Sequence, residues 1–161
     1  MTPKNLTRTI VVGYDGSAAA HAAVEEAIDR AEPDGRLILV HTYQVPKDYV
    51  GATYYTPMLE DASQNAATVL DDLERGNARL SEMERVRDLT LGSPAVAITR
   101  AAEVYEADEI VIGSRGLGYL RALLGSVAYE VIHRAHCPVT VIPERMIEVG
   151  AESPAAAVST V

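Results

Sequence analysis

Short runs of apolar residues alternate along this chain with longer segments in which apolar residues recur at helical spacing. The first run, Thr9–Tyr14, is β-branched and almost continuously apolar, which is typical of a strand buried on both faces of a parallel sheet. The same pattern predicts strands over 36–43, 85–91, 109–112 and 139–142. Helical spacing predicts helices over 18–31, 58–80, 94–105 and 126–135.

Turn and capping residues mark the boundaries of these elements. Asp15-Gly16-Ser17 supplies a turn and a helix N-cap, and Pro33-Asp34-Gly35 ends the first helix. Ser93 is a good N-cap residue, and Pro94 suits the first position of a helix. The segment 44–57 is irregular and is predicted to be a long loop, a type of segment that is usually functional or mobile.

The order of elements predicts the fold class. Strictly alternating strands and helices indicate an α/β domain with a Rossmann-like, doubly wound, five-stranded parallel sheet and helices on both faces. We expect one domain over 1–145 and a disordered tail over 146–161. In such sheets ligands bind beyond the carboxyl ends of the strands, where the strand order reverses. Asp15 and Gly113 both lie at strand carboxyl ends and are expected to face the same crevice.

Charge and composition exclude some classes of partner. The chain has 161 residues and a formal net charge of −9, which argues against nucleic acid and against an anionic membrane surface as partners. The segment Met1–Thr9 lacks the apolar core of a signal peptide, and no window is apolar for long enough to span a membrane, so a cytoplasmic location is expected. Cys137 is the only cysteine, and no metal-ligand spacing is present.

The segment Gly113-Ser114-Arg115-Gly116, followed by Gly125-Ser126, is the candidate for chemistry. It connects a predicted strand to a predicted helix, and its glycines allow close approach of the backbone to an anion. The helix that follows presents unpaired N–H groups and the positive end of its dipole. The Ser126 hydroxyl either donates to a phosphate oxygen or caps the helix. The segment is therefore either a nucleotide site or a plain turn, and basic residues surround it: Arg115, Arg121, His133, Arg134 and His136.

Other known sites do not match. The pattern GxxxxGK[ST] is absent, and Gly116–Arg121 begins like GxGxxG but has Arg121 in place of the third glycine. There is no GxSxG nucleophile elbow. His133 and His136 lie near a helix end, where interaction with the helix dipole is favoured over metal binding.

Three segments together resemble the universal stress protein family: Ile10–Ser17, Leu39-Val40-His41, and Gly113–Gly116 continuing through Gly125–Ala128 to Cys137–Ile142. The resemblance covers about residues 7 to 143. It implies strand order 3-2-1-4-5 and a homodimer formed through the last strand. Members that bind ATP carry G-x2-G-x9-G-[ST], so the resemblance implies ATP, with or without Mg²⁺, as the ligand.

The resemblance also implies roles for individual residues. Gly113, Gly116, Gly125 and Ser126 would hold the phosphates and ribose, and the Val127 backbone N–H would add a donor. Asp15 would face the ribose or a phosphate-bound metal ion, and the backbone near Thr42 would meet the adenine edge. Gly13 belongs to the first segment and completes the set of expected nucleotide-binding residues.

One departure from the family motif leaves alternatives open. Eight residues, Leu117–Leu124, separate Gly116 from Gly125 where the motif has nine. Either the loop absorbs the missing residue, or the start of the helix shifts and the phosphate cradle is lost. The favoured interpretation is an ATP-binding regulator or sensor. The alternatives are a member that works through protein contacts alone, a slow ATPase in which Asp15 orients water, and a flavin or redox protein of similar topology.

Two further features of the sequence also leave alternatives open. Arg115 either contacts phosphate or is a solvated surface charge. The tyrosines at 49, 54 and 55 either cover the pocket or pack locally.

Overall fold

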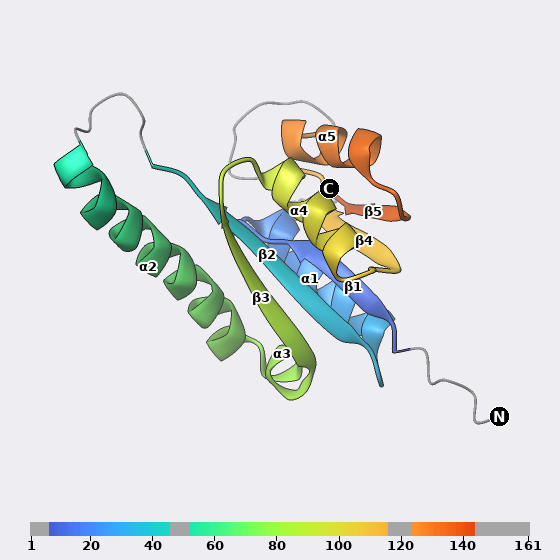
Figure 1. The fold of residues 1–161 in the computed structure, drawn as a ribbon. Coiled ribbons are helices and arrows are strands. Elements are labelled where there is room, and N and C mark those ends of the chain that lie inside the picture. Colours follow the sequence, from blue (N-terminus) through green and yellow to red (C-terminus); the bar gives the residue numbers. More distant parts are fainter. Residues whose placement is uncertain (1–6, 46–51, 116–123, 144–161) are drawn as a thin grey trace, which may run out of the picture.

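The computed structural model describes residues 7–45, 52–115 and 124–143, which form a five-stranded parallel sheet flanked by helices (Figure 1). The strand order is β3-β2-β1-β4-β5, and every neighbouring pair is parallel. The predicted fold class and strand order are therefore confirmed. The elements in chain order are β1 Thr9–Gly13, α1 Ala18–Ala31, β2 Arg36–Tyr43, α2 Ala52–Gly76, α3 Ala78–Glu82, β3 Glu84–Leu91, α4 Pro94–Val104, β4 Glu109–Gly113, α5 Ser126–Arg134 and β5 Val139–Ile142.

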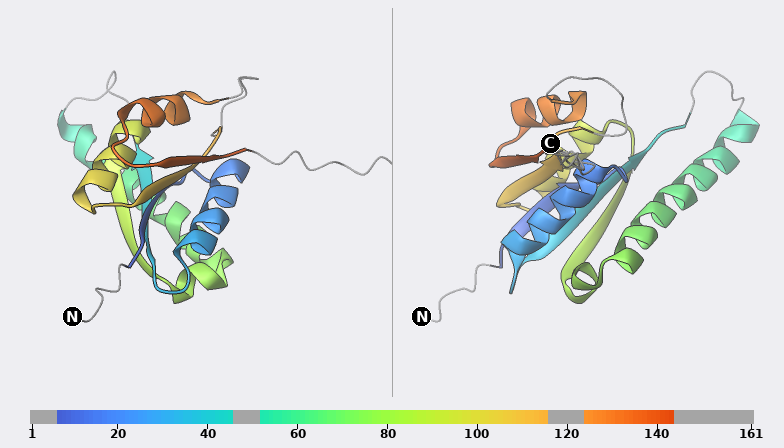
Figure 2. Two further views of the ribbon diagram at one scale, coloured as in Figure 1. Left: turned by 90° about the vertical axis from the view of Figure 1, so that its right-hand side faces the viewer. Right: turned by 180° about the vertical axis from the view of Figure 1, so that it is seen from behind.

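The sheet is buried between two helical layers, which the left view of Figure 2 separates. Successive residues of a strand point to opposite faces. In β1, Ile10 and Val12 pack with α1, α2 and α3, whereas Val11 packs with α4 and α5. All three side chains are fully buried. Burial on both faces explains why the central strands are continuously apolar in the sequence.

The second helix differs from the prediction. α2 begins at Ala52, so the predicted loop is wrong over 52–57, and the remainder of that loop up to residue 51 lies partly outside the described residues. Pro57 lies in the second turn, where proline removes only one intrahelical hydrogen bond near the helix start. The predicted helix over 58–80 is also interrupted, because the Asn77 side chain accepts the Leu80 N–H at 3.1 Å and starts α3. Local side-chain capping competes with continuation of a helix.

Other sequence expectations can be compared only within the described part. No helix in that part combines the length and the apolar character that crossing a membrane requires. The tail from residue 146 lies outside the described residues, and so does the loop between Arg115 and Leu124.

A buried carboxylate joins several elements at the amino end of the sheet. Glu109, the first residue of β4, is 3% exposed and receives ion pairs from Arg8 at 2.6 Å and Arg30 at 2.8 Å. The Thr140 hydroxyl of β5 also donates to it. These donors compensate the negative charge of the carboxylate, which offsets the free-energy cost of burying it.

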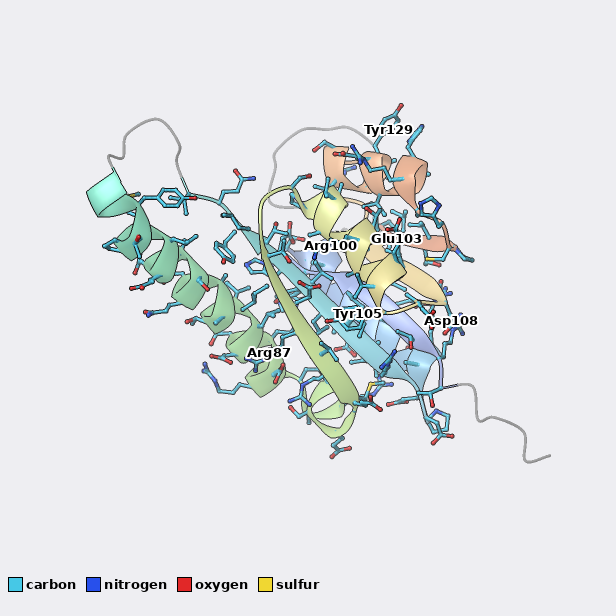
Figure 3. The ribbon with its side chains drawn as sticks, in the orientation of Figure 1. Arg87, Arg100, Glu103, Tyr105, Asp108 and Tyr129 are labelled. Carbon is cyan, nitrogen blue, oxygen red and sulfur yellow. The ribbon has the colours of Figure 1, made fainter. Side chains whose placement is uncertain are left out.

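A second ion-pair cluster attaches α2 to the edge strand β3. Glu74 of α2 binds Arg87 and Arg85 of β3, each at 2.7 Å, and Arg87 also reaches Asp71 at 2.7 Å (Figure 3). Hydrogen bonds from Arg87 and then Arg85 lower the pKa of Glu74 from 4.5 to about 2. A lowered pKa in the folded state means that the carboxylate stabilises the fold above its unfolded pKa and ceases to do so as the pH falls through the folded value.

We expect Glu74→Gln to lower the free energy of unfolding at pH 7 by about 2 kcal/mol, because two arginines lose their carboxylate partner. The difference from the wild type should shrink as the pH falls from 4.5 to about 2, where the wild-type carboxylate becomes protonated. Urea unfolding across this pH range measures both effects. Asp72→Asn is the matched control, because the Asp72–Arg75 pair is exposed and should contribute less than about 0.5 kcal/mol. A pH-independent difference for Glu74→Gln would contradict the assignment.

Candidate functional site

A cavity of about 360 Å³ lies at the carboxyl ends of the strands. Its volume falls within the range of about 300–1,000 Å³ that is usual for small-molecule sites. It lies beside the neighbouring strands β1 and β4, where the order in which the chain adds strands to the sheet reverses. Seven of the eight predicted site residues line it, and Gly116 lies outside the described residues; the seven are Gly13, Asp15, Thr42, Gly113, Gly125, Ser126 and Val127.

One wall of the cavity is strand backbone that has no neighbouring strand. β1 ends at Gly13, which pairs with Val40, whereas β2 continues to Tyr43. The Val40 carbonyl accepts the Tyr14 N–H at 2.9 Å, so it points toward β1. Backbone groups alternate along a strand, so the N–H and C=O of Thr42 face the same side, beyond the end of β1. This is the position at which the backbone of Thr42 was expected to meet a ligand.

Two glycines at the strand ends allow helices to approach closely. A Cβ built on Gly113 would lie 2.8 Å from the Cβ of Ala19 in α1. A Cβ built on Gly13 would lie 2.5 Å from Cδ1 of Ile98 in α4. Heavy atoms in ordinary contact are about 3.5–4.0 Å apart. The backbone carbonyl carbon of Ala19 also lies 2.8 Å from the Cβ position at Gly113, so there is no room for a side chain there, whereas at Gly13 the nearest atom is the end of the flexible Ile98 side chain. Helix packing is therefore sufficient to explain glycine at position 113, apart from any contact with a ligand.

The turn after β1 is held by its own side chains. Ser17 caps α1, since its Oγ accepts the Ala20 N–H at 3.1 Å, and Asp15 Oδ1 accepts the Ser17 N–H at 3.0 Å. The predicted turn and N-cap are thus confirmed. The Asp15 side chain is on an exposed residue at the mouth of the cavity, where its second oxygen is available to a ligand.

The start of α5 forms another part of the wall. Gly125 is the N-cap residue, and its N–H donates to the Ser114 carbonyl at 2.7 Å. Ser126 is the first helical residue, so the suggestion that its hydroxyl caps the helix is wrong. Ser93 occupies the N-cap of α4 as predicted but makes no side-chain capping bond. The first N–H groups of a helix have no intrahelical partner, so Ser126 and Val127 present donors at the cavity.

Several lining residues were not predicted from the sequence. His41 donates from Nδ1 to the Tyr14 carbonyl at 2.7 Å, and a carbonyl only accepts, so this nitrogen carries the proton. Val40, Pro94 and Ile98 add apolar surface. Pro94 and Ile98 are four residues apart at the start of α4, the helix that packs over β1, and that spacing is the one signal that the sequence offered.

Other candidate side chains lie elsewhere. His133 donates from Nδ1 to the Tyr129 carbonyl at 2.8 Å near the end of α5, which agrees with the expected interaction with that helix end. His136 follows α5 and lies 3.0 Å from Glu103. Tyr55 is exposed on α2 and does not line the cavity, and Tyr49 lies outside the described residues. Among the residues with described side chains, no three His, Cys, Asp or Glu residues are grouped to hold a metal ion.

The strand order defines a doubly wound α/β protein, and its cavity lies at the reversal point, where ligands bind in folds of this class. Residues 7–143 match the model of the universal stress protein family. A universal stress protein of Thermus aquaticus is 38% identical over 139 residues, covering 84% of this chain and 98% of that protein. The chain therefore belongs to the universal stress protein family.

Solved structures give the same result. The universal stress protein UspA of Lactobacillus plantarum superimposes with a TM-score of 0.72 at 25% identity, over 84% of this chain and 97% of its own. A universal stress protein solved in complex with cAMP has a TM-score of 0.63 at 26% identity, over 84% of this chain and 96% of its own. The fold is shared along nearly the full length of both neighbours.

We expect Gly113→Ala to destabilise the protein by about 2 kcal/mol even without ligand, because the added methyl group overlaps Ala19 in a packed contact. Gly76→Ala is the control. Nothing lies within 4 Å of a Cβ at that position, so alanine at the end of α2 should be neutral or slightly stabilising. Urea unfolding of the ligand-free proteins measures both. Equal stability of the two variants would contradict the packing explanation for Gly113.

Proposed function

We propose that this protein is a cytoplasmic, homodimeric member of its family that binds ATP or a related adenine nucleotide and acts as a regulator or sensor in the stress response. The observation that carries the proposal is the cavity at the reversal point, which has helix N–H donors on one wall and unpaired strand backbone on another. These two walls suit the two ends of a nucleotide.

The phosphates would bind at the start of α5. Gly125 is extended there, with φ −73° and ψ 160°, and Ser126 and Val127 follow with free N–H groups. The positive end of the helix dipole favours an anion at this point. Ser126 lines the cavity and is not the N-cap residue, so its hydroxyl would serve as a further donor to phosphate.

The base and sugar would lie toward β2. The backbone of Thr42 offers an N–H and a C=O, the pair of groups that the edge of adenine complements, and Val40, Pro94 and Ile98 provide apolar contact with the ring. Asp15 would accept from ribose hydroxyls or hold a phosphate-bound Mg²⁺ ion. The neighbour solved with cAMP supports an adenine nucleotide as the ligand class.

The short spacing between Gly116 and Gly125 is compatible with this proposal. α5 still begins at Ser126, directly after Gly125, and the hydrogen bond from Gly125 to Ser114 ties the helix start to the end of β4. With the spacing that this chain has, the start of α5 is thus held at the end of β4. A regulatory output would require that the ligand binds two states of the protein with different affinities.

Two substitutions at one position test the phosphate site. Ser126→Pro removes the backbone donor, and proline is well tolerated at the first helical position after an extended residue. We expect it to weaken ATP binding at least about tenfold, the loss expected for one charge-assisted hydrogen bond. Ser126→Ala keeps the N–H and should weaken binding less. Isothermal titration calorimetry measures both, after mass spectrometry of any nucleotide released from denatured wild-type protein.

Ala78→Pro provides the matched control, because Ala78 is the exposed first residue of α3 and follows the extended Asn77, away from the cavity. It should bind ATP like the wild type. A wild type that neither carries nor binds adenine nucleotide would refute the proposal and favour a member that works through protein contacts alone.

Among the described residues β5 has a neighbouring strand on one side only, and its other edge supports the proposed homodimer. The carbonyls of Pro138 and Ile142 accept from β4, so by alternation the backbone of Val139 and Val141 faces the outer edge of the sheet. Unpaired edges of this kind bind another strand. β5 is also only partly buried along its whole length.

We expect Val141→Pro to shift the protein from dimer to monomer, because proline removes an outward N–H while leaving the inward ladder of β5 intact. Sedimentation equilibrium measures the molecular mass. Val96→Lys, at an exposed position of α4, is the control and should remain dimeric. A wild-type mass of one chain at micromolar concentration would refute the dimer.

A further inference from the structure

One arginine at the cavity has a donor that no described residue satisfies. The Nε of Arg115 is buried and makes no hydrogen bond within the described part of the chain. Several other arginines of the described part are paired with carboxylates, as Arg79 is with Asp29 and Arg87 is with Glu74. A buried N–H group without a partner costs free energy, and this cost is removed when an acceptor binds.

The backbone of Arg115 is fixed from three directions. Its carbonyl accepts from the Ser17 hydroxyl at 3.4 Å, at the start of α1. The preceding residue, Ser114, donates to the Ile142 carbonyl at 2.7 Å and accepts from Gly125 at 2.7 Å. Arg115 is therefore held between α1, the end of β5 and the start of α5, so its side chain starts from a defined place at the cavity wall.

The charges around the cavity make this arginine important. Among the described lining residues, Arg115 is the single Lys or Arg, and Asp15 is the single carboxylate. The whole chain carries a net charge of −9, which opposes the approach of an anion. The partial positive charge at the start of α5 and the full charge of Arg115 are the local features that favour one.

We propose that Arg115 is a specificity-determining residue that binds the phosphate chain of the ligand, so that the site selects nucleotides by their number of phosphates, with ATP bound more tightly than ADP, ADP more tightly than AMP, and adenosine most weakly. This inference rests on the proposed function and names the ligand class within it. A guanidinium group suits this role because its planar array of donors matches two phosphate oxygens at once.

Calorimetric titration with adenosine, AMP, ADP and ATP at one ionic strength tests the inference. In the wild type, affinity should rise along this series. Arg115→Gln should weaken ATP binding about tenfold to a hundredfold while leaving adenosine binding within about twofold, because only the charged ligands lose an ion pair. Arg115→Lys should recover part of the lost affinity. Arg100→Gln is the matched control, since Arg100 is exposed on α4 and does not line the cavity (Figure 3).

Each contrary outcome has a distinct meaning. Equal ATP affinity of Arg115→Gln and the wild type would overturn the inference and leave the proposed function standing. An equal loss for adenosine and ATP would also overturn it, by showing that Arg115 only shapes the site. Inorganic tripolyphosphate separates the remaining cases. If it binds in an Arg115-dependent manner while adenine nucleotides do not, the proposed function fails and the role of Arg115 stands. If neither binds, both are overturned.

Discussion

The close contact of α1 and α4 with the ends of β4 and β1 is the constraint on which the site depends. At Gly113 the backbone and Cβ of Ala19 leave no room for a side chain, and at Gly13 the side chain of Ile98 occupies the equivalent space on the opposite face. Because α1 comes this close to β4, the turn at Ser17 reaches the carbonyl of Arg115. Because α4 comes this close to β1, Ile98 lies at the cavity wall. A larger residue at position 113 would push α1 away from β4, and a larger residue at position 13 would displace the Ile98 side chain from the cavity wall.

The polar groups at the two ends of the sheet differ in whether they have hydrogen-bond partners. At the amino end, Glu109 is buried and its charge is satisfied by Arg8, Arg30 and Thr140. At the carboxyl end, the first N–H groups of α5 have no intrahelical partner and the Nε of Arg115 has no partner among the described residues. Satisfied polar groups stabilise a fold, whereas unsatisfied donors that share a cavity lower the cost of binding an acceptor. The paired polar groups thus lie at one end of the strands and the cavity lies at the other.

The sheet was predicted well because its central strands are buried on both faces. A short, continuously apolar, β-branched run such as Thr9–Tyr14 is typical of such a strand. The prediction failed at α2, where the irregular segment 44–57 was predicted to be a loop although the helix begins at Ala52 and contains Pro57, and at Asn77, where a side-chain cap starts a new helix. The predicted site residues came from a motif, and most of them do meet at one cavity. His41 and Ile98 were missed because lining a cavity depends on how helices and strands pack, which no local pattern of residues records.

The structure also changes what the glycine motif means. Gly113 is required by Ala19 whether or not a ligand binds, so its presence in the sequence is weaker evidence for a nucleotide than the motif suggests. The eight-residue spacing is weaker evidence against one, because α5 still begins directly after Gly125 and the Gly125–Ser114 hydrogen bond joins its start to the end of β4. The groups that packing does not explain still bear on nucleotide binding. They are the N–H groups at the start of α5 without an intrahelical partner, the backbone of Thr42, and the Nε of Arg115, which has no partner among the described residues. These groups bear on binding because the fold alone gives no reason for them to face one cavity.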